Sequence, residues 1–222
     1  MTYSYRFVFI TALFVTSILA ANILIVKQVS LAGITLPAAI VIFPLSYIFG
    51  DVLTEVYGYS QARRVIWLGF FCNLLLVIAI WIVGILPPAS IFDAQPAYDR
   101  ILGNTPRFLI ASFIAYLAGE FVNSYIMAKM KLLTNGRWLW MRTISSTIAG
   151  EGIDTALVLS ISFLGVLPTG VILTMIFWHW LLKTAYEALA TPLTYFLVGY
   201  LKKAEKLDTY DHGINFNPLR AD

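Results

Sequence analysis

Six long runs of apolar residues, separated by short polar segments, make up most of the chain. Each run reaches the length of about 20 residues that a helix needs to cross a bilayer. The pattern therefore predicts an all-α integral membrane protein, a six-transmembrane-helix bundle within residues 1–201, followed by a polar cytoplasmic tail at 202–222. The predicted spans are about 7–26, 31–56, 64–86, 105–128, 143–166 and 171–198.

The first run has features of a secretory signal peptide, because Arg6 precedes it and the small residues Ala20 and Ala21 lie within it. A signal peptide has a short apolar core, however, whereas this run continues to Val26. It is therefore interpreted as the first transmembrane helix.

Lysine and arginine are divided unevenly between the two sides of the predicted bundle. With the N-terminus inside, eleven of them lie in cytoplasmic segments and three on the opposite side, with Lys183 left inside the last span. This bias predicts that both termini are cytoplasmic. The longest connection, 87–104, then faces outward, either as a cap over a cavity or as a plain connector. The tail is expected to be partly mobile.

Composition narrows the class further. Hydrophobic residues make up 59% of the 222 residues and charged residues 12%, which leaves no room for a separate soluble domain. The net charge of +3 comes from scattered residues and does not form a nucleic-acid-binding patch. The lone Cys72 excludes an internal disulfide and a thiolate metal cluster.

Half of the twelve acidic residues fall within the predicted spans, against the single base Lys183. Each such carboxylate costs about 2.5–3.5 kcal/mol on insertion scales, so it indicates a binding site or pathway. Together with the amides of Asn22 and Asn123 they predict a polar cavity inside the bundle. The six acids are Asp51, Glu55, Glu120, Glu151, Asp154 and Glu187.

Two polar stripes follow from spacings of four residues, which bring side chains onto one helix face. The first contains Phe43, Tyr47, Asp51 and Glu55, and the second contains His179, Lys183 and Glu187.

The first stripe has two interpretations. Asp51 and Glu55 lie towards the cytoplasmic end of their span, where they are either solvated or paired with Arg63 and Arg64. We therefore expect Phe43 and Tyr47 to form a cavity wall that continues into a cytoplasmic gate. The gating residues are Asp51, Glu55, Arg63 and Arg64.

The other polar residues also have structural alternatives. Lys183 and Glu187 could form an ion pair within one helix, and His179 could be interfacial. Asn22 and Asn73 could join helices, at under about 1 kcal/mol each. Glu120, Glu151 and Asp154 are harder to explain structurally, since one lysine cannot neutralise them all; they require protonation, a bound cation or a donor-rich substrate.

Motifs of common intramembrane enzymes are missing from the sequence. It has no His-Glu-x-x-His, no Gly-x-Ser-x-Gly and only two histidines, so no metal site of the usual histidine type is expected. It also has no Walker A loop. We expect no enzyme and no cofactor, but a transporter, a binding subunit or a channel.

Several motifs, which agree in order along the chain, resemble the queuosine precursor transporter family, also called the vitamin uptake transporter family. The motifs are Phe43-Pro44-Leu45-Ser46-Tyr47 with Gly50-Asp51-x3-Glu55, Ala111-Ser112-Phe113-x2-Tyr116-x2-Gly119, the segment from Ser145 to Thr155, and Lys183-x-Ala185-Tyr186-Glu187-x2-Ala190-Thr191-Pro192.

The resemblance implies a bacterial inner-membrane protein that imports 7-deazaguanine bases for queuosine in tRNA: the nitrile base, the aminomethyl base or queuine. It implies a fold similar to that of the substrate-binding subunits of energy-coupling-factor importers. It also implies that the protein transports without the ATPase module of those importers. Carboxylates could accept hydrogen bonds from the N–H groups of the base, amides could bind its edge and aromatic rings could stack on it. The predicted substrate-binding residues are Asn22, Phe43, Tyr47, Glu120, Asn123, Glu151, Asp154, Lys183 and Glu187.

Two other functions stay open. Ala12, Thr16 and Ala20 form a small-residue face, which suits docking to a separate energising module, a homodimer contact or packing within the bundle. Alternatively, the buried acids hold an ion in a cation-coupled transporter or channel for another small solute.

Overall fold

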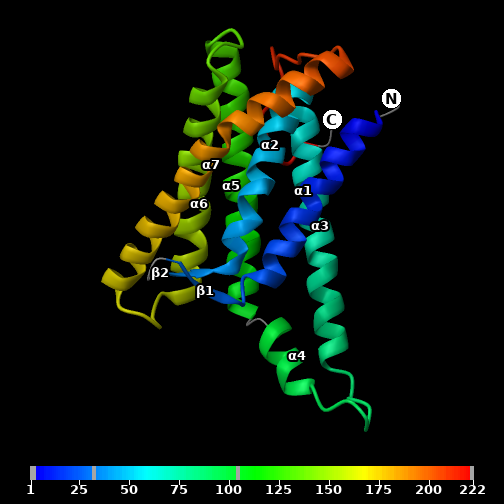
Figure 1. Ribbon diagram of the computed structural model, residues 1–222, viewed down its shortest axis with the longest axis vertical. Coiled ribbons are helices and arrows are strands. Elements are labelled where there is room, and N and C mark those ends of the chain that lie inside the picture. The colour runs from blue at the N-terminus through cyan, green and yellow to red at the C-terminus, as the bar shows by residue number, and fades with distance from the viewer. Residues whose placement is uncertain (1–3, 32–33, 104–105, 221–222) are drawn as a thin grey trace.

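The computed structural model describes residues 4–31, 34–103 and 106–220. The chain forms six long helices, a hairpin and a short helix. Figure 1 shows the long helices in a bundle, with the hairpin and the short helix at the end opposite the two termini. The expected all-α architecture is confirmed. The elements are α1 (Tyr5–Leu24), β1 (Gln28–Leu31), β2 (Ile34–Pro37), α2 (Phe43–Tyr57), α3 (Tyr59–Gly84), α4 (Gln95–Leu102), α5 (Pro106–Leu133), α6 (Leu139–Phe163) and α7 (Thr169–Glu205).

The outside of the bundle is apolar and part of its interior is polar. Leu75 and Phe196 are both 68% exposed, whereas Glu120 and Arg142 are buried. This distribution is the one expected when lipid surrounds the helices. Five helical segments are long and apolar enough to cross a bilayer: α1, α2 with its preceding turn, α3, the segment containing α5, and α6. The chain is a multi-pass membrane protein, and α7, 37 residues long, contains the sixth predicted span.

The second predicted span was wrong at its start. Its first residues form an antiparallel hairpin, in which Gln28 pairs with Pro37 and Leu31 pairs with Ile34. A short 3₁₀ turn at Ala38–Val41 follows, and α2 begins only at Phe43. Hydropathy alone cannot distinguish a buried strand from a helix, and β-branched residues together with a proline favour the strand here.

Gly58 joins α2 directly to α3, which begins at residue 59 instead of at 64 as predicted. Its φ of 84° lies in the left-handed region that favours glycine. The backbone N–H of Tyr59 donates to the Asp211 carboxylate at 3.0 Å, so a negative charge lies at the N-terminus of α3. Burial raises the pKa of Asp211, against the effect of this hydrogen bond.

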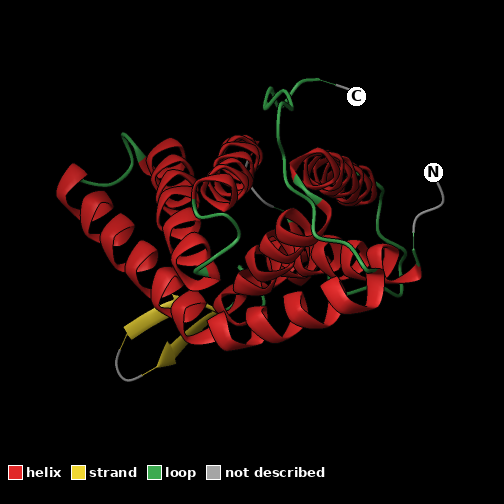
Figure 2. Cartoon of the chain, turned by 90° about the horizontal axis from the view of Figure 1, so that it is seen from above, coloured by secondary structure: helices red, strands yellow, loops and turns green. Residues whose placement is uncertain are grey.

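The expected mobile tail is in fact packed on the bundle. Residues 202–205 continue α7, and the following segment folds back against α3, as Figure 2 shows from above. Tyr59 Oη donates to the carbonyl of Phe216 at 3.0 Å, and Trp67 Nε1 donates to that of Pro218 at 2.8 Å. The tail therefore covers the ends of the helices near the termini.

The connection 87–104 contains α4, which lies beside the end of α3. Tyr98 Oη donates to the carbonyl of Ile80 at 3.3 Å. The described side chains between Pro87 and Gly103 are exposed or partly exposed. Whether this segment caps a cavity stays a prediction.

Candidate functional site

A cavity of about 150 Å³ lies at the end of the bundle that holds the hairpin. Six helices and the 3₁₀ turn surround it, so it is enclosed on several sides and is mainly apolar. Amide, imidazole and charged groups reach its wall from four of these helices, namely Asn22 on α1, Asn73 on α3, Asp154 on α6, and His179 and Lys183 on α7. Such a combination of apolar walls and a few placed polar groups is typical of small-molecule sites.

The Lys183 ammonium is the centre of this polar wall. Its Nζ lies 2.8 Å from Glu151 Oε2 and 3.0 Å from Asp154 Oδ2, so it forms ion pairs with two residues one turn apart on α6. The same Nζ lies 4.0 Å from the ring centroid of Phe43, within cation–π range. Two carboxylates and one ammonium therefore meet beside an aromatic ring, with one negative charge in excess.

The predicted ion pair between Lys183 and Glu187 is absent. Lys183 reaches across to α6, because two carboxylates there offer it charge-assisted hydrogen bonds. Both carboxylate oxygens of Glu187 are buried, and among the described residues they have no hydrogen-bond partner.

Two glycines let α5 and α6 approach closely and so position the acids. A Cβ added to Gly119 would lie 2.9 Å from both Tyr47 Oη and Asp154 Cβ. A Cβ added to Gly150 would lie 2.8 Å from Asn123 Cβ. Only glycine tolerates such contacts without a shift of the helices.

Asn22 and Asn73 also meet at the cavity, where Asn22 Nδ2 donates to Asn73 Oδ1 at 2.7 Å. Of the nine residues predicted to bind substrate, four line the cavity, namely Asn22, Phe43, Asp154 and Lys183. The prediction missed Asn73, Tyr116 and His179, which line the same cavity. A signal was present for two of them. Asn73 interrupts an apolar run, and His179 lies one helical turn before Lys183.

The remaining predicted contacts lie deeper than the cavity wall. Tyr47, Glu120, Asn123, Glu151 and Glu187 are buried and do not line it. Glu151 is nevertheless joined to the wall through Lys183.

Asp51 lies in the same deeper layer. It accepts a hydrogen bond from Asn123 Nδ2 at 2.8 Å, and Glu120 Oε2 would lie 3.2 Å from a Cβ added to Gly50, the residue before Asp51. Acidic groups from α2 and α5 therefore meet behind the cavity.

A second charged cluster, which we call the Glu55 network, lies at the end of the bundle near the termini. Glu55 Oε1 is 2.6 Å from Lys202 Nζ, 2.8 Å from Arg142 Nη2 and 3.5 Å from Lys131 Nζ. Asp208 of the tail joins it, with its Oδ1 at 2.5 Å from Lys131 Nζ and 2.9 Å from Lys202 Nζ. Partial burial raises the pKa of Asp208, but hydrogen bonds from the two lysines outweigh this and hold that pKa below its usual value.

The predicted pairing of Arg63 and Arg64 with Asp51 and Glu55 was wrong. Arg63 Nη1 donates to the tail carbonyls of Asn215 and Asn217, at 3.2 and 2.8 Å. Arg64 is exposed. The turn at Gly58 places the start of α3 under the tail, whereas Glu55 meets cations from α5, α6 and α7.

Within the part of the chain that the structure describes, no three His, Cys, Asp or Glu side chains are grouped so that they could hold a metal ion.

Known proteins resemble this chain over most of its length. The model of the vitamin uptake transporter family matches residues 37–197. A probable queuosine precursor transporter of Bacillus subtilis (strain 168) is 31% identical over 176 residues, 79% of this chain and 77% of that protein. The queuosine precursor transporter of Escherichia coli (strain K12) is 25% identical over 163 residues, 73% of this chain and 71% of that one. No solved structure matches the chain. The chain therefore belongs to the vitamin uptake transporter family.

Proposed function

We propose that this protein imports a 7-deazaguanine precursor of queuosine across the bacterial inner membrane. The observation that carries the proposal is the contact of Lys183 with Glu151, Asp154 and the Phe43 ring at the cavity wall. The names of the relatives in Bacillus subtilis and Escherichia coli support the substrate class.

The chemistry of this wall suits a guanine-like base. Such a base presents N–H donors beside its O6 acceptor, and pockets for single bases combine hydrogen bonds to that edge with stacking. Asp154 is placed to accept from the base, Lys183 to donate to its O6, and Phe43 to stack on its ring. Asn22 adds an amide, and Glu151 holds Lys183 in position. The excess negative charge would also favour the cationic aminomethyl form.

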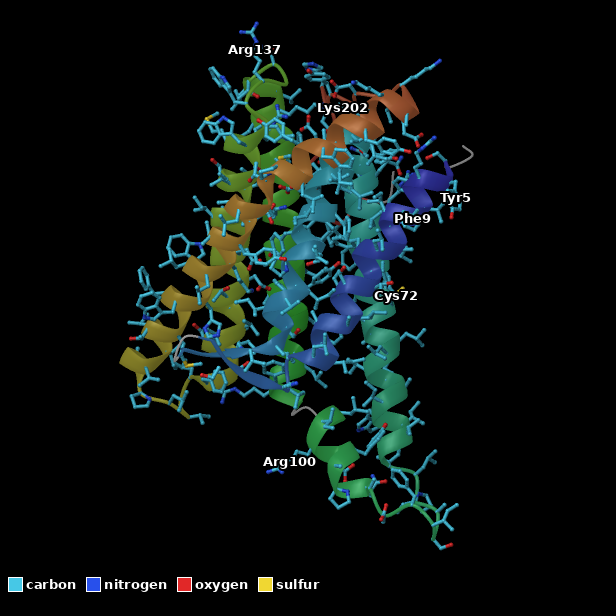
Figure 3. All side chains as sticks on the ribbon, in the orientation of Figure 1. Tyr5, Phe9, Cys72, Arg100, Arg137 and Lys202 are labelled. Carbon is cyan, nitrogen blue, oxygen red and sulfur yellow. The ribbon has the colours of Figure 1, made fainter. Side chains whose placement is uncertain are left out.

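We further propose that both termini are cytoplasmic and that the cavity opens to the outside. Figure 3 places Arg137 and Lys202 at the end near the termini and Arg100 at the opposite end. The larger number of basic residues at the first end supports this orientation.

The Glu55 network and the tail would then form the cytoplasmic gate. Glu55 on α2 forms ion pairs with Lys131 on α5, Arg142 on α6 and Lys202 on α7. Arg63 on α3 donates a hydrogen bond to the tail carbonyl of Asn217. Asp51 lies one turn from Glu55, between this gate and the cavity. Substrate release to the cytoplasm requires these contacts to separate.

Uptake of precursor by a queuosine-auxotrophic host tests the function. We expect Lys183→Ala and Asp154→Ala to abolish uptake, because each removes a contact to the base. Lys183→Ala also leaves the buried carboxylates of Glu151 and Asp154 without their cation. Lys203→Ala, at an exposed position of the same helix as Lys183, is the matched control and should keep uptake normal. Unchanged uptake in the two cavity variants, at normal membrane levels, would refute the site. Direct binding of the three bases to the purified protein would identify the substrate.

A second candidate is a binding subunit of an energy-coupling-factor importer. Ala12 and Thr16 are exposed on α1 and Ala20 is partly exposed, so this small-residue face is free for close helix contact with another subunit. Co-purification of an ATPase complex, lost when Ala12 and Thr16 are replaced by leucine, would support this candidate. A homodimer through the same face would appear as a doubled mass of the purified protein.

A further inference from the structure

Three carboxyl groups behind the cavity form no ion pair with a cation among the described residues. Asp51 on α2, Glu120 on α5 and Glu187 on α7 are each at most 1% exposed. Asp51 Oδ2, Glu120 Oε2 and both oxygens of Glu187 have no hydrogen-bond partner among the described residues. We call these three residues the carboxyl layer.

The cations near the carboxyl layer do not neutralise its negative charge. Of the cations, Lys183 is bound to Glu151 and Asp154, and Arg142 is bound to Glu55. The electrostatic neighbours of the layer lie on three helices. They are Tyr47 and Glu55 on α2, Tyr116 and Asn123 on α5, and Arg142, Glu151 and Asp154 on α6. Lys183 on α7 faces Glu151 and Asp154.

A buried carboxylate with neither a cation nor a full set of hydrogen bonds is too costly to keep its charge, so it binds a proton. A metal ion does not fit the layer, since the described side chains form no grouping that could ligate one. The ion suited to these three groups in this conformation is therefore the proton.

The position of the layer connects the cavity with the gate. Glu120 and Glu187 each follow a cavity-lining residue, Tyr116 and Lys183, by four positions. Four residues of an α-helix rise about 6 Å. The carboxyl layer therefore begins about one helical turn from the cavity wall, on the side of the end near the termini. Asp51 in turn lies four positions before Glu55 of the gate.

We propose that the carboxyl layer is a proton-binding site and that it couples import to the inward movement of one proton per base. This rests on the proposed function. A proton from the outside binds a carboxylate oxygen of Glu187 when the cavity is open outward. It leaves to cytoplasmic water when the Glu55 network separates and wets the layer. No other bond is made or broken, and the proton gradient supplies the free energy.

Proteoliposomes containing the purified protein test the coupling. The probe is the tritiated nitrile base, which has no titratable amine and so is not trapped by the pH difference itself. With the interior one pH unit more alkaline, we expect accumulation of about tenfold, the ratio for one proton per neutral solute. A dye in the lumen should record acidification that depends on added base.

Glu187→Gln should keep base binding and base exchange at wild-type levels and reduce the pH-driven accumulation ratio to about one, because glutamine carries no exchangeable charge. Glu205→Gln, the same change at the only other glutamate of α7, should accumulate base as the wild type does. If Glu187→Gln does not reach the membrane, Glu187→Ala is measured in its place with the same expectation.

The outcomes separate the two proposals. The coupling alone would be overturned by either of two results. In the first, the wild type binds and exchanges base, but its accumulation does not depend on the pH gradient. In the second, the Glu187→Gln or Glu187→Ala variant accumulates base fully. Failure of the protein to bind any of the three bases would overturn the proposed function and the coupling together.

Discussion

Arg142 has the largest of the fully buried side chains, and it shows how much depends on single charged residues here. Its Nη2 lies 2.8 Å from Glu55, while its Nη1 donates to the carbonyl of Arg137 and to Thr134 Oγ1. In the sequence, Arg142 counts only as one of the basic residues that indicate orientation. Its partner, Glu55, lies on another helix. How the two helices pack decides this pairing, and residue spacing along a single helix carries no information about that packing.

We expect Arg142→Met to lower the free energy of unfolding by about 3 kcal/mol, the lower end of the range for breaking a buried ion pair, because Lys202 and Lys131 still face Glu55. Unfolding in mixed micelles with increasing denaturing detergent measures this. The exposed Arg137→Met is the control and should change stability by less than about 0.5 kcal/mol. Equal stability of Arg142→Met and wild type would contradict a role for this ion pair.

At the scale of the elements, the apolar runs predicted the six long helices because hydrophobic length is set directly by the bilayer. The same signal failed at Ile34–Pro37, where residues just as apolar form β2. The spacing of four placed Asp51 and Glu55 on one face correctly, and both are buried. It could not tell that Lys183 would prefer Glu151 and Asp154 to Glu187, since that choice depends on how α6 and α7 pack.

The close contact of α5 with α6 gives a prediction for a whole element. In Gly119→Ala the new methyl group would meet Asp154 Cβ, Tyr47 Oη and the carbonyl of Gly150 at 2.9–3.0 Å, and the backbone cannot yield easily. We expect a loss of about 1–3 kcal/mol, typical of overpacking, and weaker base binding because Asp154 shifts. Thermal unfolding and equilibrium binding measure the two effects.

Gly199→Ala is the matched control, since nothing lies within 4 Å of a Cβ at this position of α7. Alanine there should leave binding unchanged and stabilise the helix by up to about 1 kcal/mol. Normal binding and stability in Gly119→Ala would mean that the helices can separate at little cost.

At the scale of the whole molecule, the two ends of the bundle differ. The hairpin and α4 lie at one end, and the termini lie at the other (Figure 1). The first end holds the cavity, and the second holds the Glu55 network under the packed tail. The sequence predicted a polar interior, but not this division, because the tail contacts of Asp208 and Asp211 join residues far apart in the chain. An alternating-access cycle fits the arrangement, with the described structure closed at the end near the termini.

The proposed orientation of these two ends can be measured with cysteine labelling. In a Cys72→Ala background, a cysteine is introduced at Ile91, which is 93% exposed before α4, or at His212 in the tail, which is also exposed. A membrane-impermeant maleimide added to intact cells should label Ile91→Cys. That end of the bundle carries few basic residues and is therefore expected to face outward. His212→Cys should react only after the membrane is permeabilised. Labelling in the opposite order would place the cavity on the cytoplasmic side, and the protein would then be built for export of its ligand from the conformation described.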